Sequence, residues 1–140
     1  MIRFSRKEDY AVILINKLVQ NYKKRLVPLS EIAKEYNISV LFLRNLALEL
    51  RNVGIVKAIG GQNGGYFLQK DPTKLKIGEI LSLFSKKPML ECCSVGKGKP
   101  HCPKEKVCDP GFAWRRINKE FLDKIYNLSF NEFIHYQTAG

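Results

Sequence analysis

The stretch that decides the fold is VPLSEIAKEYNISVLFLRNLALELRNVGIVKAIGGQNGGYFLQKDP, residues 27–72. Within it, Ser30 is a good N-cap for a short helix over residues 31–36. After a tight turn, Ser39 caps a longer helix, which Gly54 ends. Two helices joined by a short turn, with the second one longer, are typical of a helix-turn-helix.

The residues that follow the longer helix predict a β-hairpin. Residues 55–59 and 66–68 read as strands, and the turn between them, GGQNGG at 60–65, contains glycines that permit positive φ. A hairpin directly after a recognition helix is a wing, and this one can bring its backbone N–H groups, with Gln62 or Asn63, against DNA. A nucleotide-binding loop is excluded, because the Walker Lys-Ser/Thr is missing and no helix follows the glycines.

The longer helix is the predicted recognition helix. Taken alone, Leu41 and Leu48 favour an ordinary amphipathic core helix, because they are apolar and lie on the face that should meet DNA. The predicted hairpin directly after this helix favours the other interpretation, a recognition helix in a winged helix-turn-helix. The predicted DNA-binding residues are four in the recognition helix and its cap, two in the wing and one that contacts phosphate: Ser39, Phe42, Arg44 and Asn45; Gln62 and Asn63; and Ser30.

Further helices are predicted on both sides of this stretch. Ser5 and Glu8 have the spacing of a capping box, so a first helix should start near Arg6. After the hairpin, four apolar residues at helical spacing predict another helix: Ile77, Ile80, Leu81 and Phe84. We expect a mainly α fold with a small β-hairpin, in three parts: a winged helix-turn-helix domain (1–87), a cysteine-rich loop (88–111), and a long dimerisation helix with a short C-terminal helix (112–140).

The charge of the chain favours a polyanionic partner. The 140 residues carry a formal net charge of +11, and residues 1–87 hold sixteen of the 24 basic residues but seven of the 13 acidic ones. The charged start MIRFSRKEDY does not resemble a secretory signal, and no segment approaches the roughly 20 apolar residues of a membrane span. We therefore expect a cytoplasmic protein with no membrane partner. With only His101 and His135 and no catalytic triad in view, we do not expect an enzyme.

All four cysteines lie within the 17 residues from Cys92 to Cys108, in a long irregular segment. In a reducing cytosol such cysteines are more often ligands or redox groups than a disulfide framework. A zinc site could use three thiols and His101, although paired Cys-x-x-Cys ligands are missing. A disulfide switch could use thiols near the lysines of the loop. An iron–sulfur cluster suits widely spaced thiolates such as Cys93-x8-Cys102-x5-Cys108, and the spacing leaves all three open.

From FSRKEDYAV (4–12) to its last helix, the chain resembles the Rrf2 family of bacterial transcription factors. The most specific part is GIVKAIGGQNGGYFL (54–68), where that family carries a glycine-rich wing ending in Gly-Gly-Tyr. Two positions depart from the family pattern. Gly60 stands where an arginine often precedes the wing glycines, and Arg44 stands where some members have a glutamate. The resemblance implies a winged-helix regulator, but the operator of a relative cannot be transferred.

The resemblance also implies an iron–sulfur cluster, 2Fe–2S or 4Fe–4S, held by three cysteines of the loop. Cys102-x5-Cys108, with Trp114 six residues further on, matches cluster-binding members, and Cys93 is the preferred first ligand. Some members place a histidine three residues after the last cysteine, where this chain has Gly111, and others use a carboxylate from the first helix of the other subunit. Further candidate ligands are Cys92, Asp9 of the partner subunit, and His101.

A last long helix is predicted over residues 112–127, with more apolar surface than one small core can cover. Its apolar stripe, the predicted dimer contact, comprises Trp114, Ile117, Phe121 and Ile125. A twofold dimer would place two recognition helices about one DNA turn or a small multiple apart on a palindromic operator. The sequence thus predicts a dimeric DNA-binding transcriptional regulator that senses iron–sulfur, redox or nitric oxide status. The nearer alternative is a regulator of the same fold whose thiols bind zinc or stay free, and which a small molecule or a protein partner controls. The more distant alternative is an iron–sulfur electron carrier, or an enzyme whose helical domain only packs.

Overall fold

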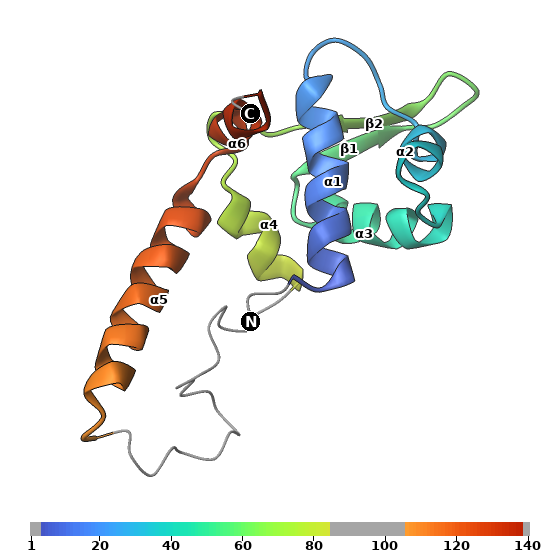
Figure 1. The fold of residues 1–140 in the computed structure, drawn as a ribbon. Helices are drawn as coiled ribbons and strands as arrows, with labels where there is room; N and C mark the ends of the chain where they lie inside the picture. Colours follow the sequence, from blue (N-terminus) through green and yellow to red (C-terminus); the bar gives the residue numbers. More distant parts are fainter. Residues whose placement is uncertain (1–3, 85–105, 139–140) are drawn as a thin grey trace.

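The computed structural model describes residues 4–84 and 106–138 (Figure 1). In these two stretches the chain forms six helices and a two-stranded antiparallel sheet, which confirms the expected mainly α fold with a β-hairpin. In chain order the elements are α1 (Arg6–Gln20), α2 (Leu29–Tyr36), α3 (Val40–Asn52), β1 (Val56–Ile59), β2 (Gly65–Leu68), α4 (Ile77–Phe84), α5 (Asp109–Asn127) and α6 (Phe130–Thr138). The succession α2, α3, β1, β2 is that of a winged helix-turn-helix.

The hydrophobic core is built around α1, which contacts α3, α4 and α6. Four α1 side chains at helical spacing are buried in it: Ala11, Leu14, Ile15 and Leu18. The stripe predicted for the recognition helix belongs to the same core and is at most 1% exposed: Leu43, Leu46, Ala47 and Leu50. Burial of this apolar surface fixes one face of α3 against the domain and leaves the opposite face outside.

Serine caps fix the start of three helices, as the sequence predicts: Ser5 for α1, Ser39 for α3, and Ser129, which has the same capping-box spacing as Ser5, for α6. At α1, the Ser5 N–H donates to Glu8 Oε2 (2.6 Å) and the Glu8 N–H donates to Ser5 Oγ (3.3 Å), a complete capping box. At α6, Ser129 and Glu132 form the same reciprocal pair at 3.0 and 3.1 Å. At α3, Ser39 Oγ accepts a hydrogen bond from the amide three residues further on (3.4 Å). These bonds pair amide groups that the helices cannot pair internally.

The expected cap of α2 is wrong. The helix begins at Leu29 with Pro28 in the N-cap position, so Ser30 lies inside its first turn. Proline at φ −70° fits the extended backbone of an N-cap, and its carbonyl accepts a hydrogen bond from the Glu31 N–H (3.2 Å). The Ser30 side chain is therefore not used as the cap and is exposed to solvent.

The last long helix also begins before the expected residue 112. α5 starts at Asp109, and Cys108 occupies its N-cap position, where Sγ accepts a hydrogen bond from the Gly111 N–H (3.4 Å). Pro110 lies in the first turn, where a helix needs no amide donor from proline. The last cysteine of the chain is thus the cap of this helix, and the expected irregular loop ends before residue 109.

The wing is attached to the chain segment that precedes α2. β1 and β2 pair antiparallel, and Ile59 opposite Gly65 is the last pair before the hairpin turn. Next to it, Tyr66 and Val27 form an isolated bridge, in which each N–H donates to the carbonyl of the other residue (2.8 and 2.9 Å). A Cβ at Gly65 would lie 2.8 Å from the carbonyl carbon of Val27, so only glycine permits this approach.

The C-terminal helices return to the core. A Cβ at Gly78 of α4 would lie 2.6 Å from the carbonyl oxygen of Tyr126, so glycine lets α5 lie directly on α4. Phe130 at the start of α6 is fully buried, and its N–H donates to the carbonyl of Leu75 (2.9 Å). Figure 1 shows α5 leaving the body of the domain, with its N-terminal end away from the other helices. No helix within residues 4–84 and 106–138 is both long and apolar enough to cross a membrane.

Candidate nucleic-acid interface

The outer face of α3 has the position of a DNA-reading surface. Arg44 and Asn45, both predicted to contact DNA, are exposed in its second turn. The winged fold presents this helix on the same side as the hairpin, as required for simultaneous contact with a groove and its flanking backbone. The individual base and phosphate contacts stay predictions.

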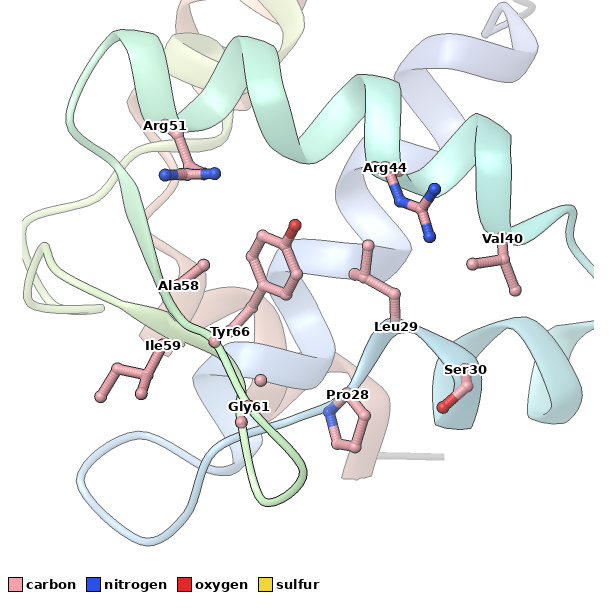
Figure 2. Close-up of a pocket in the computed structure, with 13 residues that line it drawn as sticks. Pro28, Leu29, Ser30, Val40, Arg44, Arg51, Ala58, Ile59, Gly61 and Tyr66 are labelled. Atoms are coloured by element: carbon pink, nitrogen blue, oxygen red, sulfur yellow. The ribbon is translucent and has the colours of Figure 1, made fainter.

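A groove of about 590 Å³ separates α3 from the wing and from the start of α2. Arg44 and Arg51 line it from α3, Tyr66 lines it from β2, and Ser30 lines it from α2 (Figure 2). The two arginines are seven residues apart, which places them two turns apart on one side of the helix. Guanidinium and hydroxyl groups bordered by wing glycines are suitable donors for phosphate oxygens and for guanine.

The sequence prediction missed two polar side chains that line this groove, those of Arg51 and Tyr66. Arg51 projects from the same side of α3 as Arg44, and their i, i+7 spacing is the signal that could have identified it. Tyr66 enters the groove because its backbone pairs with Val27, a contact between residues far apart in the chain. No local pattern in the sequence reports that contact.

The two predicted wing residues lie at the tip of the hairpin. Gln62 and Asn63 are both exposed, and neither is involved in the core. Gly61 has φ +101°, and its carbonyl accepts a hydrogen bond from the Gly64 N–H (3.1 Å), which closes the turn. Glycine is needed at 61 because other residues rarely adopt this conformation.

The two residues at the start of α3 already have partners inside the protein. The hydroxyl of Ser39 caps the helix. The ring of Phe42 is half-buried and packs edge-on against Tyr10 of α1, with ring centroids 5.3 Å apart. Both therefore help to position α3, whatever contacts they make with DNA.

Ion pairs hold α2 beside the groove. The Arg25 guanidinium donates to both carboxylate oxygens of Glu31, at 2.8 and 2.6 Å. These hydrogen bonds lower the pKa of Glu31 and raise the pKa of Arg25. Lys17 of α1 pairs with Glu35 at 2.6 Å and ties the other end of α2 to the core. Both pairs are partly exposed to solvent, so they orient α2 more than they stabilise it.

Only part of the predicted cluster site falls within the described residues. Cys92, Cys93, His101 and Cys102 lie outside them, and Cys108 lies at the N-cap of α5, half-buried and not in a disulfide. Asp9 is exposed in the first turn of α1, whereas its neighbour Glu8 is buried and used by the capping box. In residues 4–84 and 106–138, no three His, Cys, Asp or Glu side chains are grouped so that they could hold a metal ion.

The apolar stripe predicted on the last long helix is only partly covered. Trp114 and Ile117 are 49% and 48% exposed, while Phe121 and Ile125 are half-buried. The stripe becomes more exposed toward the N-terminal end of α5, which is the end that carries Cys108. A helix with this much uncovered apolar surface is suited to pairing with another chain.

The fold and the outer face of α3 define a winged helix-turn-helix transcriptional regulator. The sequence model of the Rrf2 family, described as "Iron-dependent Transcriptional regulator", matches residues 4–136. The chain therefore belongs to the Rrf2 family, whose members are transcriptional regulators that bind DNA and not enzymes.

Three comparisons show which known proteins the chain is similar to. The HTH-type transcriptional regulator IscR of Klebsiella pneumoniae (strain 342) is 28% identical over 136 residues, which are 97% of this chain and 82% of IscR. The structure of CymR, "the Global Cysteine Regulator of B. subtilis", has a TM-score of 0.77 and 24% identity, and the match covers 97% of this chain and 98% of that one. The oxidized form of Staphylococcus aureus CymR has a TM-score of 0.70 and 27% identity, with 94% of each chain covered.

Proposed function

We propose that the chain acts as a dimer that reads a palindromic operator and responds to iron–sulfur, redox or nitric oxide status through a cluster held by its cysteine segment. The observation that carries the proposal is the position of Cys108 at the start of α5. The last residue of the predicted cysteine ligands is also the N-cap of α5, the helix whose apolar face is uncovered. A change at this thiol would therefore act directly on the helix expected to form the dimer.

The DNA-reading half of the proposal rests on α3, the wing and the groove between them. Arg44 and Asn45 would contact bases, and Gln62 and Asn63 would contact the flanking backbone or minor groove. Ser30, free of a capping role, would contact phosphate from the first turn of α2. The basic excess of residues 1–87 would supply the general attraction for DNA.

The dimer would form through α5. Its stripe of Trp114, Ile117, Phe121 and Ile125 would be covered by the same stripe of a second copy, in a twofold arrangement. Two recognition helices related by that axis would face successive major grooves, which is why the operator should be palindromic. We place the regulator in the cytoplasm, where bacterial DNA lies.

The donor atoms suit an iron–sulfur cluster. Cys93, Cys102 and Cys108 would supply three thiolates, and Asp9 of the partner subunit a carboxylate. Cys92 and His101 are the other candidates for a fourth ligand. When bound, a 2Fe–2S or 4Fe–4S cluster would make the site reactive toward oxidants and nitric oxide. Movement of Cys108 would be transmitted to the start of α5 and so shift the population of DNA-competent dimers.

The second candidate is a cluster-free regulator of the same fold. The observation that favours it is the likeness to CymR, which is described in B. subtilis as a cysteine regulator and in Staphylococcus aureus is 27% identical to this chain. In this case the thiols would bind zinc or stay free, and a small molecule or a protein partner would control DNA binding.

Native mass spectrometry of anaerobically purified full-length protein separates the two candidates. We expect a dimer with the added mass of iron and sulfide, and loss of that mass in Cys108→Ser. Comparison of Cys92→Ser with Cys93→Ser identifies the first ligand, because one of the two should keep the cluster. Protein that remains free of iron after reconstitution would contradict the cluster, and bound zinc would favour the second candidate.

A gel-shift assay tests the DNA-reading half. Fragments of bacterial promoters should differ in affinity at one stated salt concentration, since sequence reading adds to the general attraction for phosphate. Equal binding to every fragment would contradict operator recognition.

A further inference from the structure

We propose that Leu41 and Leu48 of α3 contact the methyl groups of thymines in the operator, on either side of an adenine read by Asn45. The inference rests on the proposed use of α3 in the major groove. It assigns a role to two residues that are unusual for a helix face expected to meet DNA.

The three residues form one line along α3. Leu41, Asn45 and Leu48 are spaced i, i+4, i+7, so their side chains lie above one another on a single side of the helix. That side is opposite the buried stripe. Leu41 is 62% exposed and Leu48 is 53% exposed, so the domain itself leaves most of both side chains uncovered.

The surroundings of this line favour DNA as the partner that covers it. One adjacent edge of α3 carries Arg44 and Arg51, which line the groove toward the wing. The other edge carries Glu49, which lines a second hollow together with Lys7 of α1. Apolar side chains beside guanidinium groups suit a groove that exposes methyl groups on its base edges and is flanked by phosphates. The major groove has both, because each thymine presents its C5-methyl group there.

The chemistry of one base pair accounts for the mixture of side chains. In an A·T pair, adenine offers N6 and N7 to an Asn amide, and thymine offers its methyl group to an apolar side chain in the same groove. Asn45 between two leucines therefore fits a run of A·T pairs. A G·C pair offers no methyl group and would leave Leu41 or Leu48 against polar edges.

The first experiment is selection of duplexes from random DNA by the full-length protein under anaerobic, reducing conditions. We expect each half-site of the selected DNA to contain thymines at two positions flanking an adenine. Each thymine is then replaced by deoxyuridine, which differs only by the missing methyl group. Two replacements per half-site should weaken binding about fourfold each, the factor that corresponds to one buried methyl group.

Variants assign the effect to the protein. In Leu41→Ala, uracil replacement at one of the two thymines should no longer weaken binding, and Leu48→Ala should do the same at the other. Leu83→Ala, which truncates an exposed leucine of α4, serves as the matched control and should keep both effects. Circular dichroism of each variant verifies that the fold is retained.

The outcomes separate this inference from the proposed function. If no sequence is enriched by selection, operator recognition fails and this inference fails with it. If an operator is selected but uracil binds as well as thymine throughout, the inference alone is overturned. It is likewise overturned if the uracil effect persists in the variant with both leucines replaced, because DNA shape then causes the effect. Unchanged DNA affinity in both leucine variants would also overturn it and would indicate a protein partner for this line.

Discussion

The ring of Tyr10 in α1 packs edge-on against the ring of Phe42 in α3, with centroids 5.3 Å apart and planes inclined by 79°. Asp9, the proposed ligand from the partner subunit, directly precedes Tyr10 in the chain. Phe42 lies two residues before Arg44 in the recognition helix. This contact therefore joins the second turn of α1 to the part of α3 that should read bases.

A double-mutant cycle tests that connection. Tyr10→Leu and Phe42→Leu should each destabilise the fold, and the loss in the double variant should be smaller than the sum by about 0.5–1.5 kcal/mol, the usual coupling of an aromatic pair. Urea unfolding at one protein concentration measures all four proteins. Tyr10→Leu combined with Tyr136→Leu, which changes an exposed residue of α6, should be additive. Additivity in the Tyr10–Phe42 cycle as well would mean that the ring contact contributes nothing to stability.

Arg44 is predicted to read a base. Arg44→Ala should lower affinity for the operator by about 1–3 kcal/mol and have a smaller effect on random DNA. Arg51→Ala, from the same groove, should weaken both DNAs alike if it contacts phosphate. Fluorescence anisotropy at one salt concentration compares the two variants. An equal loss on random DNA for Arg44→Ala would make it a phosphate contact.

The close approach of the wing to Val27 predicts a large difference between two glycines. In Gly65→Ala the new Cβ would lie 2.8 Å from the Val27 backbone, so the bridge must shift, and we expect a loss of about 1–3 kcal/mol in stability. Gly60→Ala meets nothing within 4 Å and should change stability by less than about 0.5 kcal/mol. Thermal unfolding compares the two variants. Similar stabilities would show that the bridge tolerates the extra carbon.

Local rules in the sequence predict most of the helix starts and the inner face of α3. Ser5, Ser39 and Ser129 are caps because a serine hydroxyl can pair a free helical amide wherever the chain turns into a helix. These local rules fail at α2 and α5, where the N-cap residues are Pro28 and Cys108. Proline there looks like a break in the sequence, although its fixed φ fits the entrance to a helix.

The groove could not be predicted in the same way. Tyr66 lines it because of a bridge to Val27, and Phe42 is half-buried because of Tyr10. Both contacts join segments far apart in the chain, so they depend on how the elements pack and not on local propensity. The exposed line of Leu41 and Leu48 was apparent in the sequence, but only the packing of α3 shows that the domain leaves it uncovered.

The ion pair at α2 predicts a pH dependence of stability. Hydrogen bonds from Arg25 lower the pKa of Glu31 below its ordinary value of 4.5. A carboxylate with a lowered folded-state pKa contributes stability above pH 4.5, and this contribution is lost as the pH falls through the lowered value. NMR titration of the Glu31 carboxyl carbon should show the lowered pKa, and Arg25→Gln should raise it. Asp71 is an internal control, because hydrogen bonds from Thr73 lower its pKa and Arg25→Gln should leave it unchanged. Equal movement of both carboxyl groups would contradict the assignment to Arg25.

The uncovered stripe of α5 predicts that one substitution separates the proposed dimer without unfolding the domain. Ile117 is 48% exposed in the single chain, so lysine at this place costs little in the monomer but would be buried in a paired stripe. We expect Ile117→Lys to sediment as a monomer with an unchanged circular dichroism spectrum, and to lose affinity for a two-site operator more than for a single half-site. Asp123→Lys, an exposed change away from the stripe that alters the charge more, should remain dimeric. If Ile117→Lys remains a dimer, the chains pair through another surface. The spacing of the two recognition helices would then no longer follow from α5.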